Sequence, residues 1–157
     1  MEAVATSVIA VLGTLLGSGV THVFQRRTAQ RIEQFTRDER LRQERLDAFS
    51  SYAGALLNYR RSLIDRWCNE CDPEVDSWED GSVLRARSYE LHSQAQEALF
   101  RVQMLTDDRE LVEKAELALK RVTRVADATD RTDLRARRDD TRSLIRDFVT
   151  AAKGHVG

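Results

Sequence analysis

Hydrophobic residues dominate the start of the chain, and the pattern changes to a charged one after Phe24. The 22 residues from Ala3 to Phe24 carry no formal charge. At a rise of about 1.5 Å per residue, a helix of this length crosses the hydrocarbon core of a bilayer, which is about 30 Å thick. The pattern therefore predicts one transmembrane helix at residues 1–24.

Small and hydroxyl residues gather on one face of this expected helix, within an arc of about 140° at 100° per residue. Helices associate in lipid through close backbone approach, which such residues permit. We expect the face to pack on another helix through Ala10, Gly13, Thr14, Gly17, Ser18 and Thr21. Two alternatives stay open: glycine and threonine are common in spanning helices that do not associate, and the same arc would line water in a pore.

Arginines follow the apolar run directly. Short arginine-rich flanks stay on the cytoplasmic side, so Arg26, Arg27 and Arg31 predict a single-pass protein of the cell membrane with its N-terminus outside. The same side chains would hold anionic lipid headgroups. A cleaved signal peptide would have basic residues before the run, where only Met1 and Glu2 stand. A helix lying on the membrane surface would carry Lys or Arg on its polar face, and this arc has neither.

The helical pattern continues beyond the membrane, because no Gly or Pro occurs between Gly19 and Gly54. Apolar residues keep a near-heptad register at Ile32, Phe35, Leu46, Phe49, Ala53, Leu56, Leu63 and Trp67. Glu39, Arg42 and Arg60 interrupt this register, which favours a bundle or an oligomeric stalk over an ideal coiled coil. The charge run from Arg37 to Asp47 predicts a solvated face with intrahelical ion pairs.

Three further helices follow an acidic segment, residues 71–82, that contains the only proline. Their apolar periodicity predicts helices over about 83–105, from Asp107 to about 125, and from Leu134 to Gly154. Asp107, with Glu110 three residues later, fits a capping box, and residues 127–133 form the next connection.

Short connections favour antiparallel neighbours. The predicted fold is all-α: an anchor at 1–24, a juxtamembrane stem at 25–47 and an antiparallel four-helix cytoplasmic bundle at 48–157. Candidates for its large core side chains are Phe49, Tyr52, Trp67, Phe100 and Phe148.

Composition supports an all-helical chain and narrows the function. Seven Gly, one Pro and 6% aromatic residues leave little turn chemistry for a large sheet. The 25 basic and 26 acidic residues give a net charge of -1, so no specific nucleic-acid binding is expected.

Catalytic and metal-binding motifs are absent from the sequence. Cys68 and Cys71 form a CxxC, but zinc needs two more ligands, and His22, His92 and His155 are isolated along the chain. A redox CxxC opens a helix beside a sheet, whereas this one ends a helix, so we interpret the pair as free thiols. The acidic segment lacks the glycine and final glutamate of a calcium loop. We therefore expect no enzyme, no cofactor and no metal site.

Three segments carry a family resemblance: VIAVLGTLLGSGVTHVFQRR, RDERLRQERLDAFSSYAGALLNYRR and QEALFRVQMLTDD. With them the sequence resembles the small KilB-like proteins of actinobacteria, over most of its length. The resemblance implies a membrane protein associated with conjugative plasmid spread through mycelium, and it brings no enzymatic residues. The cysteines and the segment up to Gly81 match no pattern of that family.

Two functional hypotheses follow. The first is a membrane-anchored helical scaffold, a homo-oligomer that gathers protein partners at the inner membrane face. The second is a membrane-perturbing effector whose anchor lines a pore after oligomerisation. Leakage from liposomes is expected only from the second.

Overall fold

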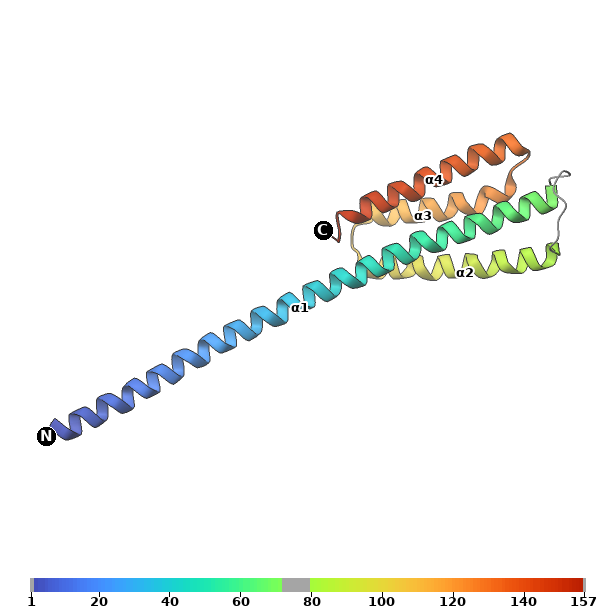
Figure 1. The fold of residues 1–157 in the computed structure, drawn as a ribbon. Helices are drawn as coiled ribbons and strands as arrows, with labels where there is room; N and C mark the ends of the chain where they lie inside the picture. Colours follow the sequence, from blue (N-terminus) through green and yellow to red (C-terminus); the bar gives the residue numbers. More distant parts are fainter. Residues whose placement is uncertain (1, 72–79, 157) are drawn as a thin grey trace. The chain divides into compact units, whose positions relative to one another are not determined.

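The computed structural model describes the backbone of residues 2–71 and 80–156, and the side chains of 32–71 and 80–156. The described residues form helices and no strand (Figure 1). These are α1 (Glu2–Cys71), α2 (Gly81–Leu105), α3 (Arg109–Thr123), the short 3-10 helix η1 (Arg124–Asp127) and α4 (Arg131–Lys153). The prediction of an all-α chain is confirmed.

The chain divides into two compact units, residues 1–41 and 42–157. In the described part of the first unit, Arg37 pairs with Glu33 at 3.0 Å, and the Thr36 hydroxyl donates to the Ile32 carbonyl at 2.8 Å. Ile32 and Phe35 are 61% and 72% exposed. This segment of α1 therefore presents two large apolar side chains to solvent.

The predicted anchor falls outside the described side chains. Its packing residues Ala10, Gly13, Thr14, Gly17, Ser18 and Thr21 and its flanking Arg26, Arg27 and Arg31 all precede residue 32. Among the residues that were described, no helix combines the length and the apolar character needed to cross a membrane.

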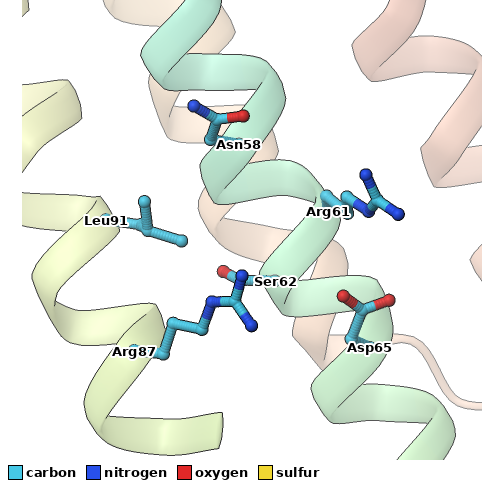
Figure 2. A pocket seen from close by; sticks show the side chains of 6 residues that line it. All are labelled: Asn58, Arg61, Ser62, Asp65, Arg87 and Leu91. Atoms are coloured by element: carbon cyan, nitrogen blue, oxygen red, sulfur yellow. The ribbon is translucent and has the colours of Figure 1, made fainter.

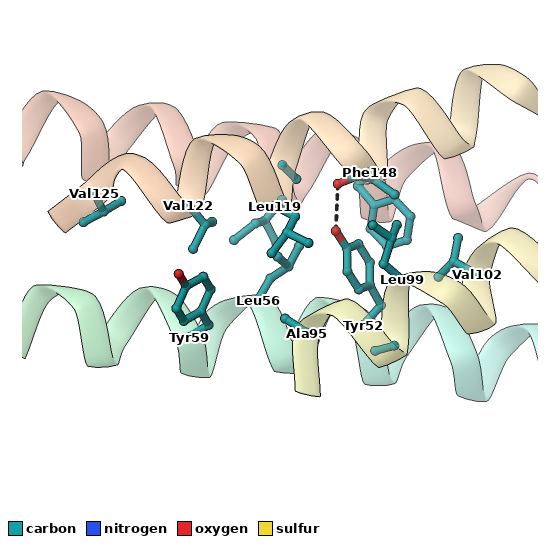
Figure 3. Close-up of a cluster of buried hydrophobic side chains, with 14 of the residues drawn as sticks. Tyr52, Leu56, Tyr59, Ala95, Leu99, Val102, Leu119, Val122, Val125 and Phe148 are labelled. Atoms are coloured by element: carbon teal, nitrogen blue, oxygen red, sulfur yellow. Dashed lines mark hydrogen bonds between the residues drawn. The ribbon is translucent and has the colours of Figure 1, made fainter. Parts of the chain in front are cut away.

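One hydrophobic core holds the second unit together. It draws buried side chains from α1, α2, α3, η1 and α4, with Tyr52, Leu56, Val102, Val122 and Phe148 near its centre (Figure 3). Burial of this apolar surface is the main source of its stability.

Four of the five large side chains expected in the core are buried: Phe49, Tyr52, Trp67 and Phe148. Phe100 is the exception, since it is 52% exposed. Leu99 takes the core position in that turn of α2, and the next residue along a helix points about 100° away. The prediction for Phe100 was wrong for this reason.

Side-chain contacts show that α2 and α4 are each antiparallel to α1. Near the start of the unit, Arg45 Nε donates to the carbonyl of Leu105 at the end of α2, at 2.8 Å. Near the end of α1, Glu70 accepts from Arg85 Nε, at the start of α2, at 2.7 Å. For α4, Arg42 Nε donates to the carbonyl of Val156, after the end of the helix, at 2.6 Å. Seven residues later along α1, the Phe49 ring meets the ring of Phe148, earlier in α4, edge-on with centroids 6.3 Å apart.

In contrast, α3 and η1 run parallel to α1. The Tyr52 hydroxyl donates to the Ala115 carbonyl at 2.7 Å. Fifteen residues later along α1, Trp67 Nε1 donates to the Ala128 carbonyl, just after η1, at 2.7 Å. These two buried side-chain donors therefore connect α1 to α3 and to the residue that follows η1.

An aspartate caps the start of each of α2, α3 and α4. Its carboxylate accepts hydrogen bonds from first-turn amides that have no partner within the helix. Asp80 accepts from Ser82 N, and Asp130 accepts from Thr132 and Asp133 N. Asp108, with extended backbone, accepts from the amides of Glu110 and Leu111 at 2.8 and 3.3 Å.

The predicted cap at Asp107 was therefore wrong by one residue. Thr106 ends α2 and its hydroxyl accepts from the Asp108 amide at 3.1 Å, which leaves Asp108 in the capping position. The fourth helix ends at Gly154, as the sequence predicts.

Candidate functional site

A polar cleft opens between α1 and α2 in the second unit, with a volume of about 470 Å³ (Figure 2). The residues that line it are Asn58, Arg61, Ser62, Asp65, Arg87 and Leu91. The first four come from one face of α1, because residues three and four positions apart lie side by side on a helix. The other two come from the facing turns of α2.

Two buried serines lie in or next to the walls of this cleft. Ser62 is buried and donates to the Tyr59 carbonyl at 2.8 Å. Ser88, buried beside Arg87, donates to the Leu84 carbonyl at 2.9 Å. Both hydroxyl groups are therefore satisfied by the backbone of their own helix.

The charged groups of the cleft are exposed and have no ionic partner within the described part of the chain. Arg61 and Asp65 extend from α1, and Figure 2 shows Arg87 extending from α2 toward Ser62. Guanidinium groups bind carboxylate and phosphate through paired N–H donors. The cleft is therefore suited to holding a small polar ligand by hydrogen bonds and charge. Its serine hydroxyl already donates to the backbone.

The two cysteines lie at the end of α1 and are not joined in a disulfide; Cys68 is half-buried and Cys71 is exposed. Cys68 packs against the core. Within residues 32–71 and 80–156, no three His, Cys, Asp or Glu side chains come together as a metal site.

The described histidines have separate structural surroundings. His155 Nε2 lies 2.9 Å from Asp108 Oδ2, so it links the C-terminal turn to the start of α3. The His92 ring lies beside that of Tyr59 in a tilted arrangement, with ring centroids 5.2 Å apart. His22 lies outside the described side chains.

The pKa of Asp108 is held below its usual range. The backbone amide of Leu111 has the largest effect, followed by the amide of Glu110 and by His155. The carboxylate is thus primarily the cap of α3, and its contact with His155 is secondary.

Two arginines of the charge run form hydrogen bonds with distant parts of the chain, which the sequence did not predict. Arg42 Nε donates to the Val156 carbonyl at 2.6 Å, and Arg45 Nε donates to the Leu105 carbonyl. Both acceptors are backbone carbonyls at the ends of other segments. A carbonyl acceptor leaves no side-chain signature, so no sequence pattern identifies these bonds.

Comparison with known proteins identifies the family. The model of the KilB plasmid transfer protein family matches residues 46–156. Protein KilB of Streptomyces lividans is 38% identical over 65 residues, which cover 41% of this chain and 40% of that protein. No solved structure matches the chain.

The family match covers all four helices of the described core, from late α1 to the turn after α4. It confirms the family resemblance, although the first of the three segments that carry it, residues 8–27, lies outside the match. Since it spans well over half of the 157 residues, this chain belongs to the KilB plasmid transfer protein family.

Proposed function

We propose that this protein is a non-enzymatic, membrane-anchored helical scaffold in plasmid transfer, and that it self-associates through its stem. One observation carries the proposal: Ile32 and Phe35 are exposed on a helical segment whose apolar register leads to the core of the second unit. Large apolar side chains at such positions are typical of helix packing surfaces. A second copy of the same segment would cover both.

The proposed architecture has three parts. An N-terminal span, residues 1–24, holds the protein in the cell membrane with its N-terminus outside. The stem at 25–47 joins it to an antiparallel four-helix bundle at 48–157 on the cytoplasmic side. The contact directions of α1 with its neighbours support this bundle, and membership of the KilB family supports the role in plasmid transfer.

The stem is tested by measuring the mass of the full-length protein in mild detergent, by light scattering corrected for bound detergent. We expect a discrete oligomer for the wild type and a monomer for Ile32→Gln/Phe35→Gln. The matched control is Tyr89→Gln/Met104→Gln, which removes two large side chains from α2 that are at least as exposed, and it should leave the mass unchanged. A stem variant with the mass of the wild type would contradict the proposal.

The anchor is tested separately. Full-length protein expressed in cells should remain with the membrane fraction after alkaline carbonate washing, whereas a chain that lacks residues 1–24 should be released. In liposomes loaded with dye, the wild type should cause no leakage. Leakage that needs residues 1–24 would favour the pore-forming alternative.

A further inference from the structure

We propose that the seam between α1 and α4 contains a binding site for a phosphate group, formed by Arg60, Arg138 and Arg142. The site is separate from the polar cleft between α1 and α2. It also stands apart from the proposed scaffold role, because it rests on different residues and a different measurement.

The register of the seam brings these arginines together. Arg42 on α1 contacts Val156 after α4, and Phe49 contacts Phe148. Later residues of α1 therefore face earlier residues of α4. Continued for three more turns of α1, this register sets Arg60 opposite the turns of α4 that hold Arg138 and Arg142. The two α4 arginines are four residues apart, on one face of their helix.

Positive charge in this cluster is poorly compensated. Arg138 and Arg142 are exposed and make no ion pair or side-chain hydrogen bond with any residue in the described ranges. Burial lowers the pKa of Arg60, and the charges of Arg142 and Arg138 lower it further. The negative charge of Asp139 acts in the opposite direction and raises the pKa of Arg60. A bound anion would remove the repulsion among the three guanidinium groups.

Arg60 also has an unused donor. Its side chain is half-buried, and its Nη1 atom is buried without a hydrogen-bond partner among the described residues. A phosphate group, with several oxygens and up to two charges, accepts from several planar guanidinium groups at once. A carboxylate, with one charge and two oxygens, satisfies fewer of them.

Binding is tested by isothermal titration of full-length protein in mild detergent with inorganic pyrophosphate. We expect saturable binding by the wild type and at least tenfold weaker binding by Arg138→Gln/Arg142→Gln. The control, Lys120→Gln/Arg121→Gln, removes the same charge from the exposed face of α3 and should bind as the wild type does. Equal weakening by both variants, or none by the α4 variant, would overturn the proposal.

A second titration distinguishes the source of the phosphate. Short-chain phosphatidylglycerol, used below its micelle concentration, presents a lipid headgroup, and short-chain phosphatidylcholine presents the same phosphate beside a cation. Arg-dependent binding of phosphatidylglycerol alone assigns the site to anionic lipid headgroups. Binding of pyrophosphate alone assigns it to a free phosphate compound, and binding of neither overturns it.

The fold of the α4 variant is checked by urea unfolding. Because both α4 side chains are exposed and repel Arg60, Arg138→Gln/Arg142→Gln should unfold at the same urea concentration as the wild type or a higher one. Loss of binding together with a higher midpoint cannot come from misfolding. A lower midpoint would mean that the arginines stabilise the fold, and it would contradict the proposed repulsion.

Discussion

The Tyr52 hydroxyl donates a hydrogen bond to the Ala115 carbonyl at 2.7 Å, in the centre of the core. Tyr52 is fully buried, and its ring meets that of Phe148 edge-on with centroids 5.1 Å apart. Because the donor belongs to α1 and the acceptor to α3, the bond sets the position of one helix along the other.

Tyr52→Phe should therefore lower the free energy of unfolding by about 1 kcal/mol, the usual net contribution of a buried hydrogen bond. The ring remains, so its edge contact with Phe148 is kept. Urea unfolding of the full-length chain, followed by circular dichroism, measures the change. Tyr89→Phe is the control, because Tyr89 is 73% exposed, and it should change little. Equal stability of both variants would contradict the role of the bond.

Alkaline pH should destabilise the protein through the same residue. Burial, and then the charge of Glu116, raise the pKa of Tyr52 above its ordinary value near 10. Above pH 10 the unfolded chain loses this proton while the folded chain keeps it, so the stabilising contribution is complete below about pH 10 and is lost as pH rises further.

Urea midpoints measured between pH 8 and pH 11 should therefore fall less steeply for Tyr52→Phe than for the wild type. Some dependence should remain, since burial also raises the pKa of Tyr59. If the two proteins gave parallel curves, Tyr52 would not be the group that couples folding to alkaline pH.

The cap of α3 distinguishes neighbouring aspartates. Asp108→Ala should lower the urea midpoint at neutral pH, because the amides of Glu110 and Leu111 lose their acceptor. Asp107→Ala should leave it unchanged. Since the pKa of Asp108 is depressed, its contribution is present above the unfolded pKa near 4 and is lost as pH falls through the lower, folded value. The two variants should thus converge in acid. A larger loss for Asp107→Ala would restore the cap that the sequence predicted.

Much of the helical core could be predicted from periodicity alone. Leu111, Ala115, Val122 and Ile145 are buried where a 3.6-residue pattern puts them. The pattern is strong because α3 and α4 each bury a single face. The helix boundaries were harder to predict. Asp107 and Asp108 have the same side chain, and only the backbone conformation after Thr106 makes Asp108 the cap of α3.

The candidate sites could not be predicted, because they depend on which helices become neighbours. Arg60 interrupts the heptad register, but nothing in the sequence says that Arg138 and Arg142 lie opposite it. Likewise, Arg61 and Arg87 form one cleft only after α1 and α2 pair in opposite directions. Sequence spacing reports the faces of single helices, and these sites belong to pairs of helices.

Phe148 and Phe100 make the strongest test of the observed core. Phe148 is fully buried between Phe49 and Tyr52, so Phe148→Ala removes both edge contacts and leaves a cavity. It should cost about 3 to 5 kcal/mol of unfolding free energy, as large aromatic truncations in cores do. Phe100→Ala removes the same atoms from a half-exposed position on α2, where water fills the space, and should cost well under half as much. Urea unfolding of both full-length variants measures the difference. Comparable losses would mean that Phe100 is covered by another surface of the protein or by a second copy, and that the core extends beyond one chain.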